Sequence, residues 1–242
     1  MKLLFSQIRY EISATLARGE SFLLTLGIPI VFLLFFSKVK VITFPAGDPV
    51  HFVAPGIMAL AIMSSAMVSL SISTGFERSY GVLTRLQATP LGRRRLITAK
   101  LLALLLVECI QVVVIALVAL SIGWNPEDLI VQAILAVVLA TAAFGGIALV
   151  LAGRLEGTVN LAVSNGIYIL LLLMGGMVIP LAKLGSLAAK IAILLPSGAL
   201  SQILHHALGG RTIGMLPWVS LSVWAVLAPL MAMKLFRFEA NR

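Results

Sequence analysis

Long apolar runs separated by short polar segments are the dominant pattern along the chain. A helix needs about 17–25 mostly apolar residues to cross the hydrocarbon layer of a bilayer, and six runs are close to that length. The pattern predicts an all-α integral membrane protein with six transmembrane helices, which form a single transmembrane domain over residues 1–242. The expected spans are residues 21–37, 52–74, 96–122, 129–151, 159–181 and 216–235.

The composition supports a membrane protein, because 60% of the residues are hydrophobic and only 11% are charged. A soluble domain carries about 25% charged residues. The single cysteine, Cys109, excludes an intrachain disulfide, and no Cys and His residues have the spacing of a metal site. The formal net charge is +9, and the charges lie in short segments beside the apolar runs. This distribution favours topology control and contact with membrane lipid over nucleic-acid binding.

The distribution of basic residues predicts the orientation of the chain. Thirteen of the eighteen Lys and Arg lie on one side of the predicted spans. This side comprises the N-terminal segment, the region from the end of the second span to the start of the third, the segment after the fourth span, and the C-terminal end. The positive-inside rule assigns this side to the cytoplasm. We therefore expect a multi-pass protein of the cell (inner, cytoplasmic) membrane with both termini in the cytoplasm.

The N-terminal segment, residues 2–19, has amphipathic helical spacing. Phe5, Ile8, Ile12 and Leu16 lie on one side of the predicted helix, and polar residues lie on the other. The segment is too polar to span a bilayer, so we expect an interfacial helix with its apolar face toward the lipid. The alternative is a surface helix that packs on the rest of the protein.

Two short apolar segments, 184–195 and 197–208, lie between the fifth and sixth spans. Each is too short to cross the bilayer, and Pro196 separates them, so we expect a re-entrant helical hairpin at the outer surface. His205 and His206 are adjacent and therefore point to different sides of a helix. They are expected to face outward as polar residues and not to form a metal site.

A polar segment, residues 76–95, separates the second and third spans and carries five arginines. Its first part, 77–89, has helical spacing, with Tyr80, Leu83 and Leu86 on one side. The proline that follows ends this predicted helix, because proline disfavours helical geometry in the residue before it. A short amphipathic helix between two spans would suit a soluble partner. A solvated loop that obeys the positive-inside rule is the alternative, and the spacing leaves both open.

Polar side chains inside the predicted spans are candidates for a transport path. Small side chains recur every four residues in the second span, from Ala61 to Ser73, where they suit either close helix packing or a polar wall. In the third span, Lys100 is expected to reach the inner surface. An acidic group as deep as Glu108 costs roughly 2.5–3.5 kcal/mol, so it should face protein or water, either as a substrate or proton contact or in an interhelical hydrogen bond. The candidate path residues are Ser65, Ser69, Glu108, Gln111 and Asn165.

Two stretches of the chain are similar to a known family. The first is Glu77-Arg-x-x-Gly-x-Leu-x-Arg-Leu-x-x-Thr-Pro-Leu-x-Arg-Arg94, followed by Lys100-Leu101. The second runs from Gly175-Gly176 through two prolines to Gly209-Gly210. In this order they resemble the membrane subunits of ABC-2 type transporters, of the daunorubicin-resistance and polysaccharide-export kind.

The resemblance implies a permease subunit of an ATP-driven exporter. It implies two cytosolic ABC ATPase subunits, a second permease subunit, identical or related, and an amphiphilic drug, lipid or lipid-linked cargo. No Gly-Lys dipeptide of a phosphate-binding loop occurs in the chain, so ATP and Mg are expected on the partner ATPase and no cofactor on this chain. The ATPase-coupling residues implied by the resemblance are Glu77, Arg78, Tyr80, Gly81, Leu83, Arg85, Leu86, Pro90, Arg93 and Arg94.

Two other classes of function remain compatible with the residues. An ion-coupled secondary transporter would often show internal repeats and broken mid-membrane helices. Here Glu108 is the only carboxylate deep in a predicted span, and no repeat is visible. A membrane protein that does not transport, such as an immunity or assembly factor, is the other alternative.

Overall fold

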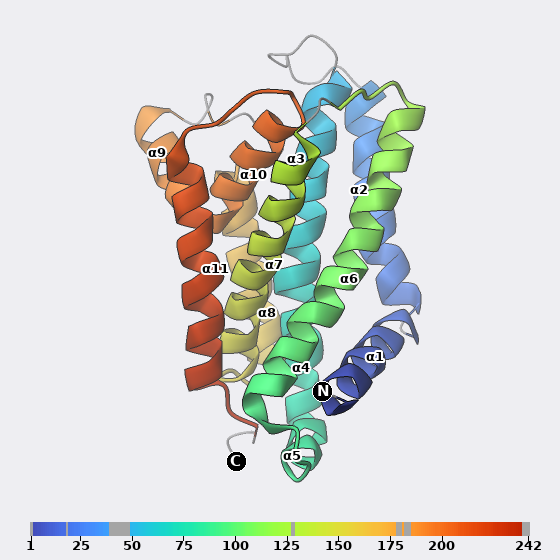
Figure 1. The fold of residues 1–242 in the computed structure, drawn as a ribbon, viewed down its shortest axis with the longest axis vertical. Coiled ribbons are helices and arrows are strands. Elements are labelled where there is room, and N and C mark those ends of the chain that lie inside the picture. Colours follow the sequence, from blue (N-terminus) through green and yellow to red (C-terminus); the bar gives the residue numbers. More distant parts are fainter. Residues whose placement is uncertain are drawn as a thin grey trace.

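The fold was analysed in a computed structural model that describes residues 2–17, 19–38, 49–126, 129–177, 181 and 185–238. Within these residues the secondary structure is helical, with no strand (Figure 1). The helices are α1 Lys2–Ala17, α2 Gly19–Lys38, α3 Pro49–Met63, a π-helical segment η1 Ser64–Ser69, α4 Leu70–Ser79, α5 Val82–Gln87, α6 Gly92–Ser121, α7 Ile130–Ala152, α8 Gly157–Met174, α9 Ser186–Leu194, α10 Pro196–Ala207 and α11 Met215–Leu235.

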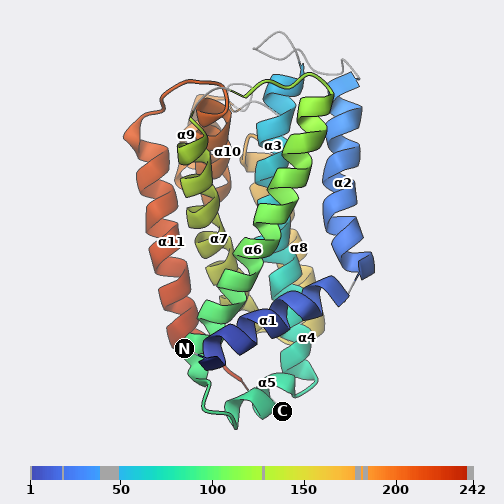
Figure 2. The same cartoon turned by 45° about the vertical axis from the view of Figure 1, so that its right-hand side comes forward.

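The long helices run side by side, and α1 lies across the end of the bundle that carries both termini (Figures 1 and 2). Five helical segments of the described chain are long and apolar enough to cross a membrane: Pro49–Ser79, which joins α3, η1 and α4, together with α6, α7, α8 and α11. The apolar part of α2 with described side chains is shorter, Thr25–Lys38. The pair α9 and α10 is bent by 95°. The all-helical membrane fold with a bent re-entrant pair is therefore confirmed.

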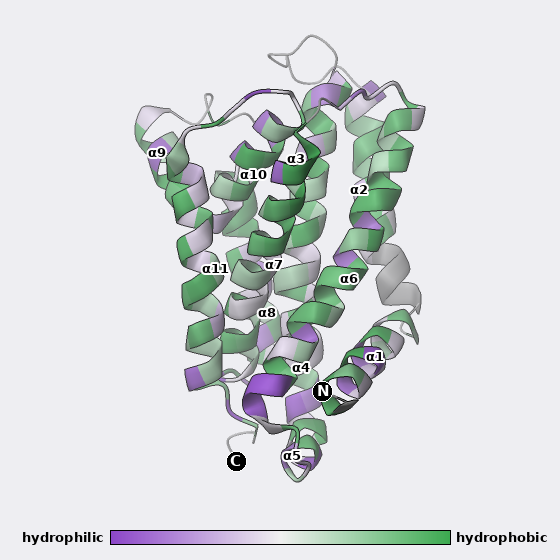
Figure 3. Ribbon diagram, viewed as in Figure 1, coloured by the Kyte–Doolittle hydropathy of each residue, from purple (hydrophilic) through white to green (hydrophobic). Residues whose placement is uncertain are grey.

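The span Pro49–Ser79 forms the centre of the bundle, because 78% of its most apolar window is buried within the chain. The corresponding share is only 28% for α6 and 22% for α8. Figure 3 shows α6 and α7 as mostly hydrophobic through their middle, with hydrophilic positions toward the ends of the bundle. Large exposed apolar side chains such as Leu106, Val113 and Leu117 of α6 suit contact with lipid tails.

Two predicted element boundaries are wrong. The helix expected over residues 77–89 does not exist as one unit, because α4 continues the second span to Ser79 and α5 begins anew at Val82. Gly81 separates them with φ 72°, a left-handed conformation that glycine adopts at little cost. The fifth span ends at Met174 and not at residue 181. Just after Met174, Gly176 turns the chain with φ 68°. The predicted outer loop between the first two spans falls largely on residues outside the described part.

Helix α10 of the bent pair lies deeper in the bundle than expected. Pro196 begins α10, and its missing N–H is harmless at the first helical position. Most of α10 is buried, against α3, α7 and α11. His205 is therefore not an outward-facing polar residue: its Nε2 lies 3.0 Å from the carbonyl oxygen of Phe52 in α3, and its Nδ1 lies 2.7 Å from that of Ser201.

A close helix contact that depends on a glycine joins α7 to α11. A Cβ atom at Gly146 would lie 2.5 Å from both the carbonyl carbon of Ala228 and the nitrogen of Pro229. Small residues allow this approach of two backbones in lipid. The pair is therefore held by backbone proximity that a larger side chain would prevent.

We expect Gly146→Ala to lower the free energy of unfolding by about 1–3 kcal/mol, because backbone atoms cannot move aside as a flexible side chain can. The measurement is thermal unfolding of the purified protein in detergent. Gly166→Ala in α8 is the matched control, since a Cβ there meets nothing within 4 Å. It should be neutral or slightly stabilising. Equal losses in the two variants would contradict the packing argument.

Candidate functional site

A buried group of three charged side chains joins segments that are distant in sequence. Lys100 of α6 places its Nζ 2.9 Å from Glu11 Oε2 of α1 and 2.7 Å from Glu77 Oε2 of α4. Lys100 is 2% exposed. We call these three residues the ion triad. It connects the N-terminal helix, the end of the second span and the start of the third.

The ion triad corrects the expectation that Lys100 reaches the inner surface. Carrying a charge into an apolar environment is costly unless it is paired and hydrogen-bonded, and here two carboxylates supply that pairing. Lys100 lies about two turns after the start of α6. Its partners could not be found from periodicity, because they lie 89 and 23 residues away.

The N-terminal helix α1 packs through a polar side and exposes apolar residues. Gln7 donates to Glu11 Oε1 over 2.8 Å, and both residues are 8% exposed. Phe5 is 72% exposed and Leu16 is 45% exposed. Helix α1 thus packs on α6, as the surface-helix alternative predicts, and its exposed apolar side is compatible with the predicted contact with lipid.

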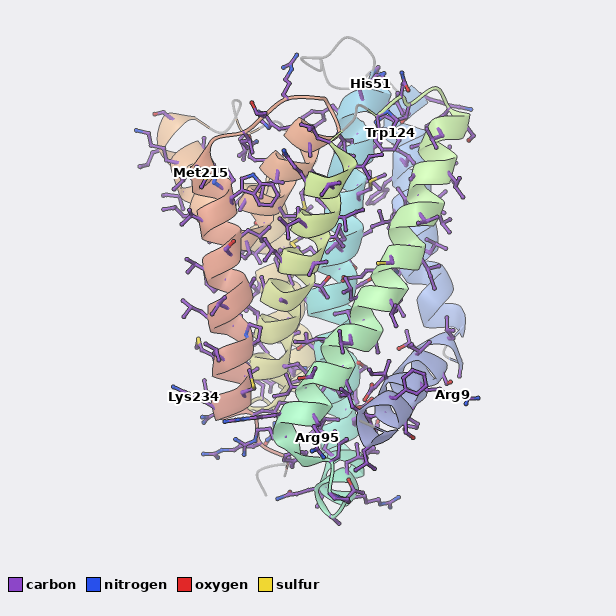
Figure 4. All side chains as sticks on the ribbon, viewed as in Figure 1. Arg9, His51, Arg95, Trp124, Met215 and Lys234 are labelled. Atoms are coloured by element: carbon purple, nitrogen blue, oxygen red, sulfur yellow. The ribbon has the colours of Figure 1, made fainter. Side chains whose placement is uncertain are left out.

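Arginines tie the helix ends together at the end of the bundle that carries the termini. Arg78, which is 3% exposed, donates to the carbonyl oxygens of Ala152 (3.1 Å) and Leu155 (2.9 Å) after α7. Arg154 donates to the carbonyl oxygen of Leu235 at the end of α11 over 2.9 Å. Cations suit these positions because the last carbonyls of a helix have no partner inside it. Figure 4 places Arg95 and Lys234 at this end, and His51, Trp124 and Met215 at the other.

The ten residues expected to contact a soluble partner comprise an anchoring group of four, one half-buried residue and an exposed group of five. Leu83 is fully buried, in an apolar cluster that includes Leu96, Leu149 and Phe236. Leu83 anchors the short helix α5 to the bundle. Glu77 and Arg78 anchor the end of α4, and Gly81 shapes the turn between α4 and α5. Leu86 is half-buried. The exposed group, which we call the basic knob, consists of Tyr80, Arg85, Pro90, Arg93 and Arg94.

A partly open cavity of about 660 Å³ lies between α1, α2, η1, α4 and α6. Ser65, Ser69 and Gln111, three of the predicted path residues, line it together. Ser65 donates to Gln111 Oε1 over 2.8 Å, and Gln111 Nε2 donates to Thr25 Oγ1 over 3.3 Å. The π-helical segment supplies part of this wall, and such segments are frequent at functional sites.

The other two predicted path residues lie outside this cavity. Glu108 is fully buried, and the hydroxyl of Thr141 in α7 donates to its Oε2. This contact is the interhelical hydrogen bond considered from the sequence. Asn165 donates to the carbonyl oxygen of Leu161 in its own helix over 2.9 Å.

A second buried polar contact joins the second span to α8. Asn160 Nδ2 donates to the carbonyl oxygen of Ser71 over 2.8 Å, and Ser71 Oγ donates to Asn160 Oδ1 over 2.9 Å. Ser164 adds a hydroxyl contact of 2.8 Å to Ser71. A Cβ atom at Gly75 of α4 would lie 2.6 Å from Nδ2 of Asn160 in α8. The two helices therefore meet closely at this point. Sequence reasoning missed this cluster. The available signal was that Asn160 and Ser164 lie four residues apart, on one side of the predicted fifth span.

The helical bundle with its long apolar helices defines a multi-pass membrane protein. The family model for the ABC-2 type transporter matches residues 3–201, so the chain belongs to the ABC-2 type transporter family. A search of curated proteins finds no match. The matched domain is a membrane permease domain, which contains no ATPase site of its own.

We expect Lys100→Met to lower the free energy of unfolding by about 3–5 kcal/mol, because it removes the cation that pairs with buried Glu11 and with partly buried Glu77. Thermal unfolding in detergent measures the loss. Lys234→Met is the matched control, since Lys234 is exposed near the same end of the bundle. The neutral triple variant Glu11→Gln, Glu77→Gln, Lys100→Met should recover most of the loss. If the triple variant were no more stable than Lys100→Met, the loss would not come from unpaired charge.

Proposed function

We propose that the protein is the permease subunit of an ATP-driven exporter that moves an amphiphilic drug, lipid or lipid-linked molecule out of the cytoplasm. Family membership supports a role in transport. The observation that carries the proposal further is the basic knob, because α5 is anchored through buried Leu83 while Arg85 projects from the bundle. A firmly held, exposed basic helix is suited to transmit force from a soluble partner.

The proposal includes partners that supply the energy. Two cytosolic ABC ATPase subunits bind ATP and Mg, contact the basic knob, and drive two permease subunits that are identical or related. The end of the bundle that carries the termini then faces the cytoplasm. The excess of Lys and Arg at this end supports that orientation. The protein accordingly resides in the cell membrane.

The ion triad offers a route for movement from the basic knob into the bundle. Movement of α5 reaches the end of α4 through the turn at Gly81. From there Glu77 and Lys100 connect it to α6, and Glu11 connects it to α1. Arg78 carries the same movement to the loop after α7. A displaced α5 would thus shift several spans together, including the walls of the cavity lined by Ser65, Ser69 and Gln111.

We expect Arg85→Glu to abolish coupling between ATP hydrolysis and transport while the protein still inserts and folds. Reversal of one exposed charge removes an attraction to the partner and adds a repulsion, without disturbing buried Leu83. The measurement is co-purification of the ATPase subunit in mild detergent, together with substrate-stimulated ATP hydrolysis in proteoliposomes.

The matched control is Arg211→Glu, because Arg211 is also exposed but belongs to the segment between α10 and α11. Figure 1 shows this segment at the end of the bundle opposite the termini. It should leave both measurements unchanged. Normal coupling in Arg85→Glu would remove the basic knob from the proposal. The absence of any co-purifying ATPase with the unmodified protein, together with uptake driven by a proton gradient, would replace the exporter by a secondary transporter.

A further inference from the structure

Four exposed basic side chains gather at the end of α11, where the last turn of this helix meets α6 and the loop after α7. Lys234 and Arg237 belong to this end of the chain, and Arg154 comes from the loop. Arg93, which is also part of the basic knob, comes from the start of α6. Figure 3 shows hydrophilic positions where α11 ends and where α6 begins. We call these four residues the α11 basic cluster.

Backbone carbonyl groups hold two of these side chains in place. Arg93 Nη1 donates to the carbonyl oxygens of Met233 over 3.3 Å and of Lys234 over 3.4 Å. Arg154 donates through Nε to the carbonyl oxygen of Leu235 over 2.9 Å. The three carbonyl groups belong to consecutive residues at the end of a helix, where such groups have no partner inside it. The two guanidinium groups therefore lie at neighbouring positions around the helix end.

The loop after α7 is docked closely on the same helix end. A Cβ atom at Gly153 would lie 2.7 Å from Cδ2 and 2.8 Å from Cα of buried Phe236. The backbone N–H of Arg237 donates to the carbonyl oxygen of Gly153 over 3.3 Å. Because Arg154 follows Gly153 directly, its guanidinium is positioned before any ligand arrives. A ligand that binds there therefore orders few additional groups, which favours binding.

Most of the donor capacity of the cluster remains available. An arginine has five N–H donors, and the carbonyl contacts occupy one nitrogen in Arg93 and one in Arg154. None of the four cations belongs to an ion pair with a carboxylate of the described residues. Even with exposed Glu156 of the same loop included, four positive charges against one negative charge leave a formal charge of about +3. The cluster therefore suits an anion, and planar guanidinium groups suit phosphate oxygens.

The position of Lys234 favours a lipid over a soluble anion. Leu227, Leu230 and Met231 precede it on α11 by seven, four and three residues, so they lie on its side of the helix. Their exposed fractions are 51%, 46% and 48%, and they suit contact with acyl chains. Lys234 ends this apolar side, where a lysine can reach the level of the lipid headgroups. Figure 4 shows its side chain projecting outward from the bundle.

We propose that the α11 basic cluster binds the headgroup of an anionic phospholipid, with the phosphate beside Arg154 and Lys234 and the acyl chains along Leu227 and Met231. A bound lipid links the loop after α7 to the end of α11, because both segments supply cations to one phosphate. The inference is independent of the proposed exporter function, since it requires neither a cargo nor an ATPase.

The test uses the full-length protein in mild detergent, with no ATPase present. The probes are phosphatidylglycerol and phosphatidylcholine with identical acyl chains, added in equal amounts. Native mass spectrometry measures the ratio of the two lipids that remain bound to the protein. We expect a preference of about fivefold or more for phosphatidylglycerol, because its phosphate is not neutralised by a choline group. Replacing chloride by inorganic phosphate at equal ionic strength should leave this ratio unchanged, since inorganic phosphate has no acyl chains.

The double variant Arg154→Gln with Lys234→Gln should reduce the preference to about twofold or less, because it removes two charges and changes side-chain length little. The matched control is Arg85→Gln with Arg211→Gln, which removes two exposed charges away from α11 and should retain the preference. Lys234→Gln alone should reduce the preference about twofold, and it leaves the contact of Arg154 with Leu235 intact. Thermal unfolding verifies that each variant is folded.

Equal binding of the two lipids to the unmodified protein would overturn the inference, as would an equal loss of preference in the two double variants. Displacement of phosphatidylglycerol by inorganic phosphate would assign the cluster to a soluble anion. Loss of ATPase co-purification in Arg154→Gln with Lys234→Gln, while the lipid preference is retained, would assign the cluster to a protein interface. Failure of the exporter proposal would leave these lipid ratios unchanged, because they are measured on the permease alone.

Discussion

The pairing of Lys100 with Glu11 and Glu77 is the interaction on which the end of the bundle that carries the termini depends. A lone ammonium at 2% exposure in an apolar helix would be strongly destabilising, and so would two neighbouring carboxylates without a cation. Lys100 therefore requires carboxylate partners, and its charge offsets the repulsion between Glu11 and Glu77. A buried ion pair is weak evidence for net stability, but it fixes which segments must meet. Here it fixes α1 and α4 against α6.

The same end of the bundle shows how short polar segments can be held firmly without burying much apolar surface. Helix α5 has only six residues, which is too short to be stable alone. It is positioned by buried Leu83, by the left-handed turn at Gly81, and by Arg78, which binds the last carbonyl groups after α7. An exposed basic surface can then move as one body with the spans and not as a loose loop.

Charge and apolar surface are also combined in the wall of the cavity. The ion triad forms one side of the cavity, and the hydroxyl groups of the π-helical segment form another. Glu77 belongs both to the ion triad and to the wall of the cavity. A shared residue of this kind provides a physical link between the end of the bundle that carries the termini and the cavity.

The predicted spans and bent pair follow from elementary patterns, because apolar length and proline positions determine them locally. Prediction was least accurate where local signals competed. The spacing of Tyr80, Leu83 and Leu86 suggested one exposed face, but Gly81 interrupts the helix and turns Leu83 into the bundle. His205 looked like a polar residue of an outer surface, yet burial of α10 directs it to a carbonyl oxygen of α3.

The sequence by itself determined that the chain is a membrane protein, approximately where it crosses the bilayer, and which side carries the basic charge. Those properties depend on composition and on neighbouring residues. Only the tertiary structure decided that Lys100 is paired and not extended to the surface, that Ser65, Ser69 and Gln111 share one cavity while Glu108 faces Thr141, and that Asn160 joins Ser71. The physical reason is that these contacts join helices distant in sequence, and the packing of the whole bundle selects the partner of each buried polar group.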